Sequence, residues 1–316
     1  MRRSLGAFVT EALFDDVGAT FALGDGRVVW ADGREAAAHD GAALSAAGHP
    51  SGEGVLTGGD DGQVVWSRPG TTETVAEAPG AWIDALATNA ASGLFAFAAG
   101  RSVVVRDAGD TKFERRFVHE KSVAGLAFDA RGRRLATATY GGVALWWARI
   151  ADQKPVIMRW AGSHVVAVFS PDGRFVISSM QENALHGWRL SDSRDMRMGG
   201  YPSKVKSVAF VDGGNFLATA GANGVVLWPF SGADGPMGKQ AMEIGFDDSA
   251  LITRVAGDGT TLAAGLDDGR VWVCDLKTQA LNPLKAEKGA PITAMAVRGG
   301  QVAWGDEAGE VGAESV

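Results

Sequence analysis

The sequence is poor in cysteine, in long apolar runs and in basic clusters, and each absence excludes a class of protein. One cysteine, Cys274, is present among 316 residues, so no internal disulfide can form. The first apolar run, Leu5 to Val9, is too short for the core of a signal peptide, and no run approaches the length of a membrane span. A single thiol fits a reducing compartment, and we expect a cytoplasmic protein that does not contact a membrane.

Positive charge is scarce as well, because the formal net charge is −7. Proteins that bind DNA or RNA neutralise phosphates with clustered Lys and Arg. We therefore expect no nucleic-acid partner. Glycine is frequent, with 44 residues, and charged residues make up only 21% of the chain. This composition is typical of many short strands joined by tight turns.

One short pattern recurs along the chain, a turn of small or acidic residues followed by an apolar run with tryptophan. It reads GDGRVVW at 24–30, DDGQVVW at 60–66, YGGVALWW at 140–147, GANGVVLW at 221–228 and LDDGRVWV at 266–273. Recurrence of one pattern indicates a repeat architecture, which must be tested before any other fold.

Each copy lies in a longer unit of short alternating runs. In the unit VKSVAFVDGGNFLATAGANGVVLW, turns separate the runs Val205–Phe210, Phe216–Ala220 and Val225–Trp228, and a weaker run follows at Met242–Ile244. Short alternating runs with turn residues between them predict antiparallel hairpins. The unit therefore predicts one four-stranded antiparallel sheet.

Third-strand positions define the period of the repeat. The aligned residues are Ala31, Ser67, Arg106, Trp146, Trp188, Trp228, Cys274 and Glu314. Eight units with a period of about 40 residues fill the chain, so we expect one domain over 1–316. A lone sheet cannot bury both faces, whereas sheets stacked in a closed ring cover one another. The last unit stops at its third strand, and residues 2–6 could supply the missing outer strand.

The chain resembles the WD40-repeat β-propellers, through FSPDGRFV at 169–176, LATATYGGVALWW at 135–147 and FLATAGANGVVLW at 216–228. The resemblance implies an all-β propeller of four-stranded blades in a divergent bacterial member of the family. Eight third strands predict eight blades, with seven as the alternative. The Trp-Asp dipeptide of the family never occurs, and its hydrogen-bonded residues are present only as partial sets, such as His119 with Thr137 and Trp146.

No motif for catalysis or for a cofactor is convincing. The sequence has neither a Gly-x-Ser-x-Gly elbow nor an HExxH motif, and GPMGKQ at 235–240 lacks the spacing and the hydroxyl residue of a phosphate loop. Its five histidines are scattered, and a metal site needs several ligands that converge. We expect no enzymatic activity, no cofactor and no metal.

Acidic residues gather in the turns between second and third strands. They are Asp25, Asp60, Asp61, Glu182, Asp267, Asp268, Asp306 and Glu307. Turn chemistry explains many of them, because Asp hydrogen-bonds its own backbone. They could also form an acidic funnel that attracts a basic peptide or a cation. Both interpretations stay open, with Asp60 and Asp267 as candidate partner contacts.

Loops of the fourth to sixth units carry aromatic, Met and charged residues outside the repeat pattern. The candidate partner-binding residues there are Tyr140, Trp160, His164, Met180, Gln181, Glu182 and Tyr201. Such residue types are common at interaction surfaces, although Trp160 and Met180 could instead be edge packing residues.

These observations predict a non-enzymatic scaffold, a monomer, that binds a protein or peptide partner on its loop face. Two alternatives remain. Bacterial proteins similar to this one are sometimes encoded near zinc-related GTPases of the cobalamin-synthesis W type, so the resemblance also implies an accessory role in zinc homeostasis. Some propellers are hydrolases or lactonases, which would require polar groups that converge in the central channel.

Overall fold

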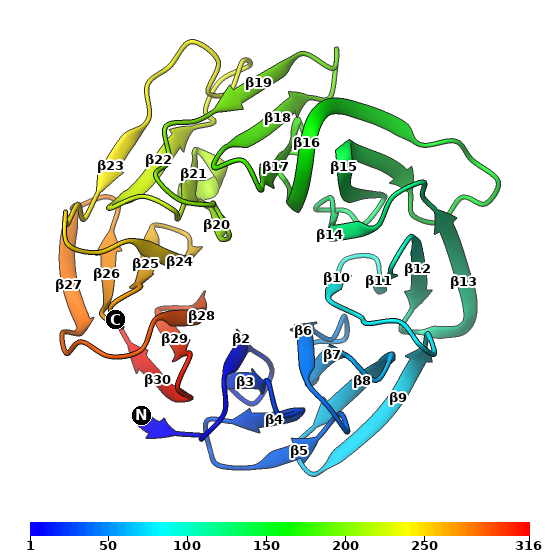
Figure 1. Cartoon of the computed structure of the whole chain (residues 1–316), viewed down its shortest axis with the longest axis horizontal. Coiled ribbons are helices and arrows are strands. Elements are labelled where there is room, and N and C mark those ends of the chain that lie inside the picture. Colours follow the sequence, from blue (N-terminus) through cyan, green and yellow to red (C-terminus); the bar gives the residue numbers. More distant parts are fainter.

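The computed structural model describes all 316 residues as strands and turns around a central opening (Figure 1). The one helical segment is a 3-10 turn at Asp212–Gly214. Every pair of neighbouring strands is antiparallel. The prediction of an all-β propeller built from four-stranded antiparallel blades is confirmed.

The strands follow the predicted repeats in chain order. Repeat one contains β2 (Val9–Phe14), β3 (Ala19–Leu23), β4 (Arg27–Trp30) and β5 (Glu35–Ala37), and repeat two contains β6 (Ala43–Gly48), β7 (Val55–Gly59), β8 (Gln63–Arg68) and β9 (Thr71–Glu77). Repeat three contains β10 (Ala85–Asn89), β11 (Leu94–Ala99), β12 (Ser102–Asp107) and β13 (Asp110–Val118). Repeats four and five share β14 (Val123–Phe128), β15 (Arg134–Trp147), β16 (Val156–Phe169), β17 (Phe175–Met180), β18 (Leu185–Arg189) and β19 (Asp195–Met198).

The remaining strands complete the ring. Repeat six contains β20 (Val208–Val211), β21 (Phe216–Thr219), β22 (Val225–Pro229) and β23 (Met242–Ile244). Repeat seven contains β24 (Ile252–Asp258), β25 (Thr261–Leu266), β26 (Val271–Asp275) and β27 (Ala280–Lys285). Repeat eight contains β28 (Ile292–Arg298), β29 (Gln301–Asp306), β30 (Glu310–Ser315) and, as its outer strand, β1 (Arg2–Ser4).

The number of separate sheets is seven, which is the alternative number and not the expected eight. Six sheets have four strands, and one has six, in the order β14-β15-β16-β17-β18-β19. The difference arises because β15 and β16 are each 14 residues long. All eight repeats are present, but repeats four and five are joined in one hydrogen-bonded sheet.

Each of the two long strands, β15 and β16, contains two of the short runs that the repeat pattern predicts as separate strands. Thr137 Oγ1 donates to Ala144 O at 3.2 Å, so the two halves of β15 lie side by side as the second and third runs of repeat four. The first part of β16 pairs with β15 (Val143 with Met158), and its second part pairs with β17 (Ala167 with Ser178). Strand β16 is therefore the outer run of repeat four and the inner run of repeat five.

The two ends of the chain meet in repeat eight. Arg3 pairs with Val311, and Leu5 N donates to Gly309 O at 2.8 Å. On the inner side, Thr293 Oγ1 of β28 donates to Val9 O of β2 at 2.6 Å. These hydrogen bonds link repeat eight to repeat one and close the ring, which Figure 1 shows from blue to red.

The apolar core lies between neighbouring repeats. One cluster joins Leu227 of repeat six to Ile252 and Leu262 of repeat seven. Close approach depends on a small residue near the end of each second strand, at Ala22, Gly58, Ala98, Ala138, Ser179, Ala220, Gly265 and Gly305. At the last of these, an added Cβ would lie 2.5 Å from Val9 Cγ1 of the next repeat. Tight packing of this kind fixes the spacing around the ring.

One face of the ring, here named the upper face, carries the two kinds of loop in which the predicted partner-binding residues lie. The chain runs up and down antiparallel strands, so the turns between second and third strands lie on the same face as the connections between repeats. Hydrogen bonds join the two: Gln181 N donates to Ser163 O at 2.9 Å, and Asp267 N donates to Leu251 O at 2.9 Å. The upper face is thus a continuous set of backbone-tethered loops.

Candidate functional site

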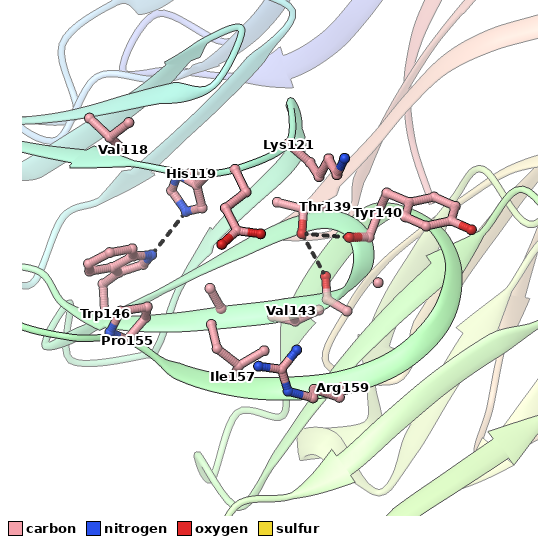
Figure 2. Close-up of a pocket in the computed structure, with 14 residues that line it drawn as sticks. Val118, His119, Lys121, Thr139, Tyr140, Val143, Trp146, Pro155, Ile157 and Arg159 are labelled. Carbon is pink, nitrogen blue, oxygen red and sulfur yellow. Dashed lines mark hydrogen bonds between the residues drawn. The ribbon is translucent and has the colours of Figure 1, made fainter.

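A hollow of about 310 Å³ opens on the upper face where repeat three meets repeat four (Figure 2). Tyr140 comes from the turn within β15, Ile157 and Arg159 from β16, and Lys121 from the connection between β13 and β14. Figure 2 shows Lys121 and Arg159 on opposite sides of the hollow, with Tyr140 at one end and Trp146 at the other. Its size falls within the range of ligand pockets.

The turn that presents Tyr140 depends on two glycines. Gly141 and Gly142 have φ values of +94° and +140°, which side chains rarely adopt. A Cβ at Gly142 would also collide with Met158 O. Because the turn is this tight, the ring of Tyr140 projects outward and is 64% exposed.

The floor of the hollow is a hydrogen-bonded set from β15 and from the connection between β13 and β14. Trp146 Nε1 donates to His119 Nε2 at 3.1 Å, and Thr137 Oγ1 lies 2.9 Å from the same nitrogen. Burial lowers the pKa of His119, which favours the neutral ring that can accept this bond. The partial set suggested by the sequence therefore forms, and it holds the floor of the hollow in place.

Three charged side chains in the lining have no partner in the protein. Lys121, Arg159 and Glu120 make neither an ion pair nor a side-chain hydrogen bond. By contrast, Arg106 in the same repeat pair is bound to Glu114 at 2.9 Å. The hollow thus combines apolar surface with three unpaired charged side chains, two positive and one negative, whose sum is +1.

Three of the residues predicted to touch a partner are buried, which corrects the prediction. The exposed fractions are 0% for His164, 3% for Met180 and 8% for Tyr201. His164 lies 2.6 Å from Ser178 Oγ through Nδ1 and donates to Trp160 O from Nε2. Met180 lies beneath Gly162. These two side chains support the loops above them and do not reach the surface.

Tyr201 has a structural role of its own. Its hydroxyl accepts a hydrogen bond from Trp228 Nε1 at 2.6 Å and lies 2.7 Å from Thr219 Oγ1. Burial raises the pKa of Tyr201 to about 12. The phenol therefore occupies in repeat six the position that His119 occupies in repeat four.

We expect Tyr201→Phe to destabilise the fold by about 1–3 kcal/mol, because the half-buried indole N–H of Trp228 and the buried hydroxyl of Thr219 lose their partner. Tyr140→Phe is the matched control, since the Tyr140 hydroxyl has no hydrogen bond and is exposed. Urea unfolding followed by tryptophan fluorescence measures both. Equal stability of the two variants would contradict the assigned role of Tyr201.

The other predicted residues remain on the surface. Trp160 is 37% exposed and stacks on His186 with ring centroids 3.8 Å apart. Gln181 and Glu182 are exposed in the turn between β17 and β18, where Glu182 Oε1 accepts a hydrogen bond from Ser163 N at 3.3 Å. These residues flank repeat five and do not line the hollow at Tyr140.

Asp60 and Asp267 are exposed but already hold backbone groups. Asp60 Oδ1 accepts from Ala42 N, and Asp267 Oδ1 accepts from Leu251 N, both at 2.9 Å. Each carboxylate ties its turn to the start of the first strand of its own repeat. This geometry supports the turn-chemistry interpretation, and neither residue lies at the hollow. A basic partner for these turns stays a prediction.

Sequence reasoning missed Lys121, Ile157 and Arg159, because their strand and loop positions look ordinary in the repeat. It also missed Glu11 and Arg254 on the inner strands β2 and β24. Burial raises the pKa of Glu11 to about 7, although Arg254 opposes the shift. A charged residue inside the apolar run FVTEALF was the available signal.

The structure shows no cluster of side chains that would support the zinc role or the hydrolase role. Nowhere do three or more His, Cys, Asp or Glu side chains gather in a group that could hold a metal ion. Glu11 stands beside an arginine and not beside a second acid or a histidine, as acid–base hydrolysis would need. The structure has no helix that is long and apolar enough to cross a membrane. The zinc and hydrolase roles stay predictions.

Comparison with known proteins supports the fold alone. No protein-family model and no curated protein matches the chain. Among solved structures, the computationally designed Ika8 protein matches with a TM-score of 0.80 and 18% identity, over 99% of this chain and 98% of that one. The β-propeller domain of Cps50 (Swd1) from Myceliophteria thermophila matches with a TM-score of 0.67 and 14% identity, over 87% of this chain and 96% of that domain. The chain is a β-propeller.

Proposed function

We propose that this propeller is a non-enzymatic scaffold that captures a segment of a partner protein in the hollow around Tyr140. The proposal includes divergent membership of the WD40-repeat proteins, as the repeat motifs suggest. The observation that carries it is an exposed tyrosine fixed by a two-glycine turn above an open hollow. Rigid aromatic side chains beside pockets are common anchors of protein interfaces.

Exposed apolar side chains line the hollow and continue past it at Val156. Val118 is 68% exposed on one edge, and Val156 and Ile157 are 56% and 41% exposed on β16. Contiguous exposed apolar surface in a soluble protein marks an interaction site. Because these residues come from the outer strands of repeats three and four, a bound segment would lie across the boundary between the two repeats.

The test is selection from a phage-displayed library of random nine-residue peptides, followed by binding of the selected peptides to purified variants. We expect Tyr140→Ala to weaken binding by at least tenfold, because the aromatic anchor is lost. Trp82→Ala is the matched control, since Trp82 is 68% exposed in the connection between repeats two and three. Equal effects of the two changes, or no selected peptide, would overturn the proposal.

A further inference from the structure

Charge is distributed unequally around the ring. Residues 101–206, from β12 through β19 to the start of repeat six, carry eighteen Lys and Arg against ten Asp and Glu. The rest of the chain carries twelve Lys and Arg against twenty-seven Asp and Glu. A chain with a net charge of −7 therefore contains a basic arc, which occupies the right and upper parts of the ring in Figure 1.

The hollow lies inside this basic arc, and its two cations are free. Lys121 and Arg159 are both exposed and have no carboxylate within ion-pair distance. Six of the other twelve arginines of the arc are paired with a carboxylate, such as Arg134 with Asp129 at 2.9 Å and Arg174 with Asp172 at 2.6 Å. Surface arginines that find no internal partner beside an apolar hollow are available to a ligand.

Resting on the function proposed above, we propose that the partner segment is acidic and that a Glu or Asp side chain of it binds between Lys121 and Arg159 while an apolar neighbour packs on Tyr140 and Ile157. The guanidinium of Arg159 can hold a carboxylate through two N–H groups, and Lys121 adds a point charge from the opposite side. Val118 and Ile157 supply the apolar wall for the neighbouring residue.

A carboxylate fits this site better than a phosphate. Phosphate groups carry nearly two negative charges and are usually bound by clusters of arginine. Here the lining contains one arginine, one lysine and the unpaired carboxylate of Glu120. The net charge of +1 in this lining is neutralised by a single negative charge, whereas a dianion would leave an excess negative charge beside Glu120. Two cations are also too few to hold a nucleic-acid backbone, which proteins bind through many phosphate contacts.

The experiment uses the nine-residue peptides selected on the full-length protein as described above. Their sequences are expected to be enriched in Glu or Asp next to Leu, Phe or Trp. Fluorescence anisotropy then compares a selected peptide with versions in which each Glu is changed to Gln, Lys or phosphoserine, and with a single-stranded DNA oligonucleotide. We expect the change of Glu to Gln to weaken binding of the peptide at least tenfold. The Lys and phosphoserine versions and the DNA oligonucleotide should also bind more weakly than the original Glu peptide.

Protein variants complete the test. Arg159→Glu and Lys121→Glu should each weaken binding of the acidic peptide at least tenfold. Arg131→Glu is the matched control, since it changes the charge by the same amount at an exposed site on the opposite face of repeat four. Loss of binding in Arg159→Glu and not in Arg131→Glu supports the proposal, provided that circular dichroism shows both variants folded.

The outcomes separate this inference from the proposed function. Selected peptides that are neutral or basic, yet lose binding in Tyr140→Ala, would overturn the acidic partner and leave the scaffold function standing. Tighter binding of the phosphoserine version or of DNA would overturn the choice of a carboxylate. Peptides whose binding is unaffected by Tyr140→Ala would overturn both.

Discussion

Replacing Gly305 by Ala is expected to lower the free energy of unfolding by about 2–3 kcal/mol, the usual cost of an extra group in a well-packed core. The new Cβ would lie 2.5 to 2.9 Å from the three side-chain carbons of Val9, which are held rigidly in the next repeat. Repeat one would have to move away from repeat eight. Differential scanning calorimetry should show the melting temperature falling by about 2–5 °C.

Gly48→Ala is the matched control. Gly48 also lies in a strand, but a Cβ there would meet nothing within 4 Å. We expect this variant to be as stable as the parent protein or slightly more stable, because alanine restricts the unfolded chain. Adding Val9→Ala to Gly305→Ala should recover part of the loss, since the clash is with the Val9 side chain. Equal melting temperatures for the two glycine variants would refute the packing role of Gly305.

Acidification is expected to destabilise the protein strongly between pH 6.5 and 4. Burial lowers the pKa of His49 and of His186 to about 4, and it also lowers the pKa of His119 and of His164. The unfolded chain therefore binds more protons than the folded chain in this range. Stability is full above the unfolded pKa of about 6.5 and is lost as the pH falls towards the folded value.

The size of the effect is on the order of 3 kcal/mol for each histidine shifted to a pKa of about 4. Glu11 acts in the opposite direction, because burial raises its pKa to about 7 and its neutral form stabilises the fold below that pH. Its contribution to the free energy of unfolding is roughly equal to that of one histidine and has the opposite sign. Urea unfolding at pH 7.0 and at pH 4.5 measures the difference.

Two variants test the assignment of these opposing contributions. Glu11→Gln removes the carboxyl but keeps its shape, so the loss of stability between pH 7.0 and pH 4.5 should become larger. His49→Gln should make the loss smaller. A stability that is independent of pH in the parent protein would contradict the assigned histidine shifts, and a Glu11→Gln variant with unchanged pH dependence would contradict the role of Glu11.

Much of the fold could be predicted because the repeat is written in local turn and strand signals. The runs predicted at Phe216–Ala220, Val225–Trp228 and Met242–Ile244 are the strands β21, β22 and β23 within one residue at each end. The number of separate sheets was harder to predict than the individual strands. The long strands β15 and β16 remain continuous across turns that elsewhere separate two strands, and no residue type marks that continuity.

The candidate site was predictable only in part, because the sequence shows residue types and not burial. Tyr140 and Tyr201 look alike as loop tyrosines, yet one is exposed and the other buried. Spacing held the missing signal. Tyr201 precedes Thr219 by 18 residues and Trp228 by 27, the same spacing that links His119 to Thr137 and Trp146. This spacing indicates that Tyr201 belongs to a buried hydrogen-bonded set with Thr219 and Trp228 and not to a binding surface.

The unequal arcs of charge give the ring an electric dipole that lies in its own plane. A charged body that approaches from a distance would rotate the molecule before any contact forms, because the field of a whole protein acts beyond its contact surface. At an ionic strength of 0.15 M this influence extends about 8 Å, and it reaches farther in dilute buffer. Encounter rates should therefore depend on salt even where the contacts of the final complex are mainly apolar.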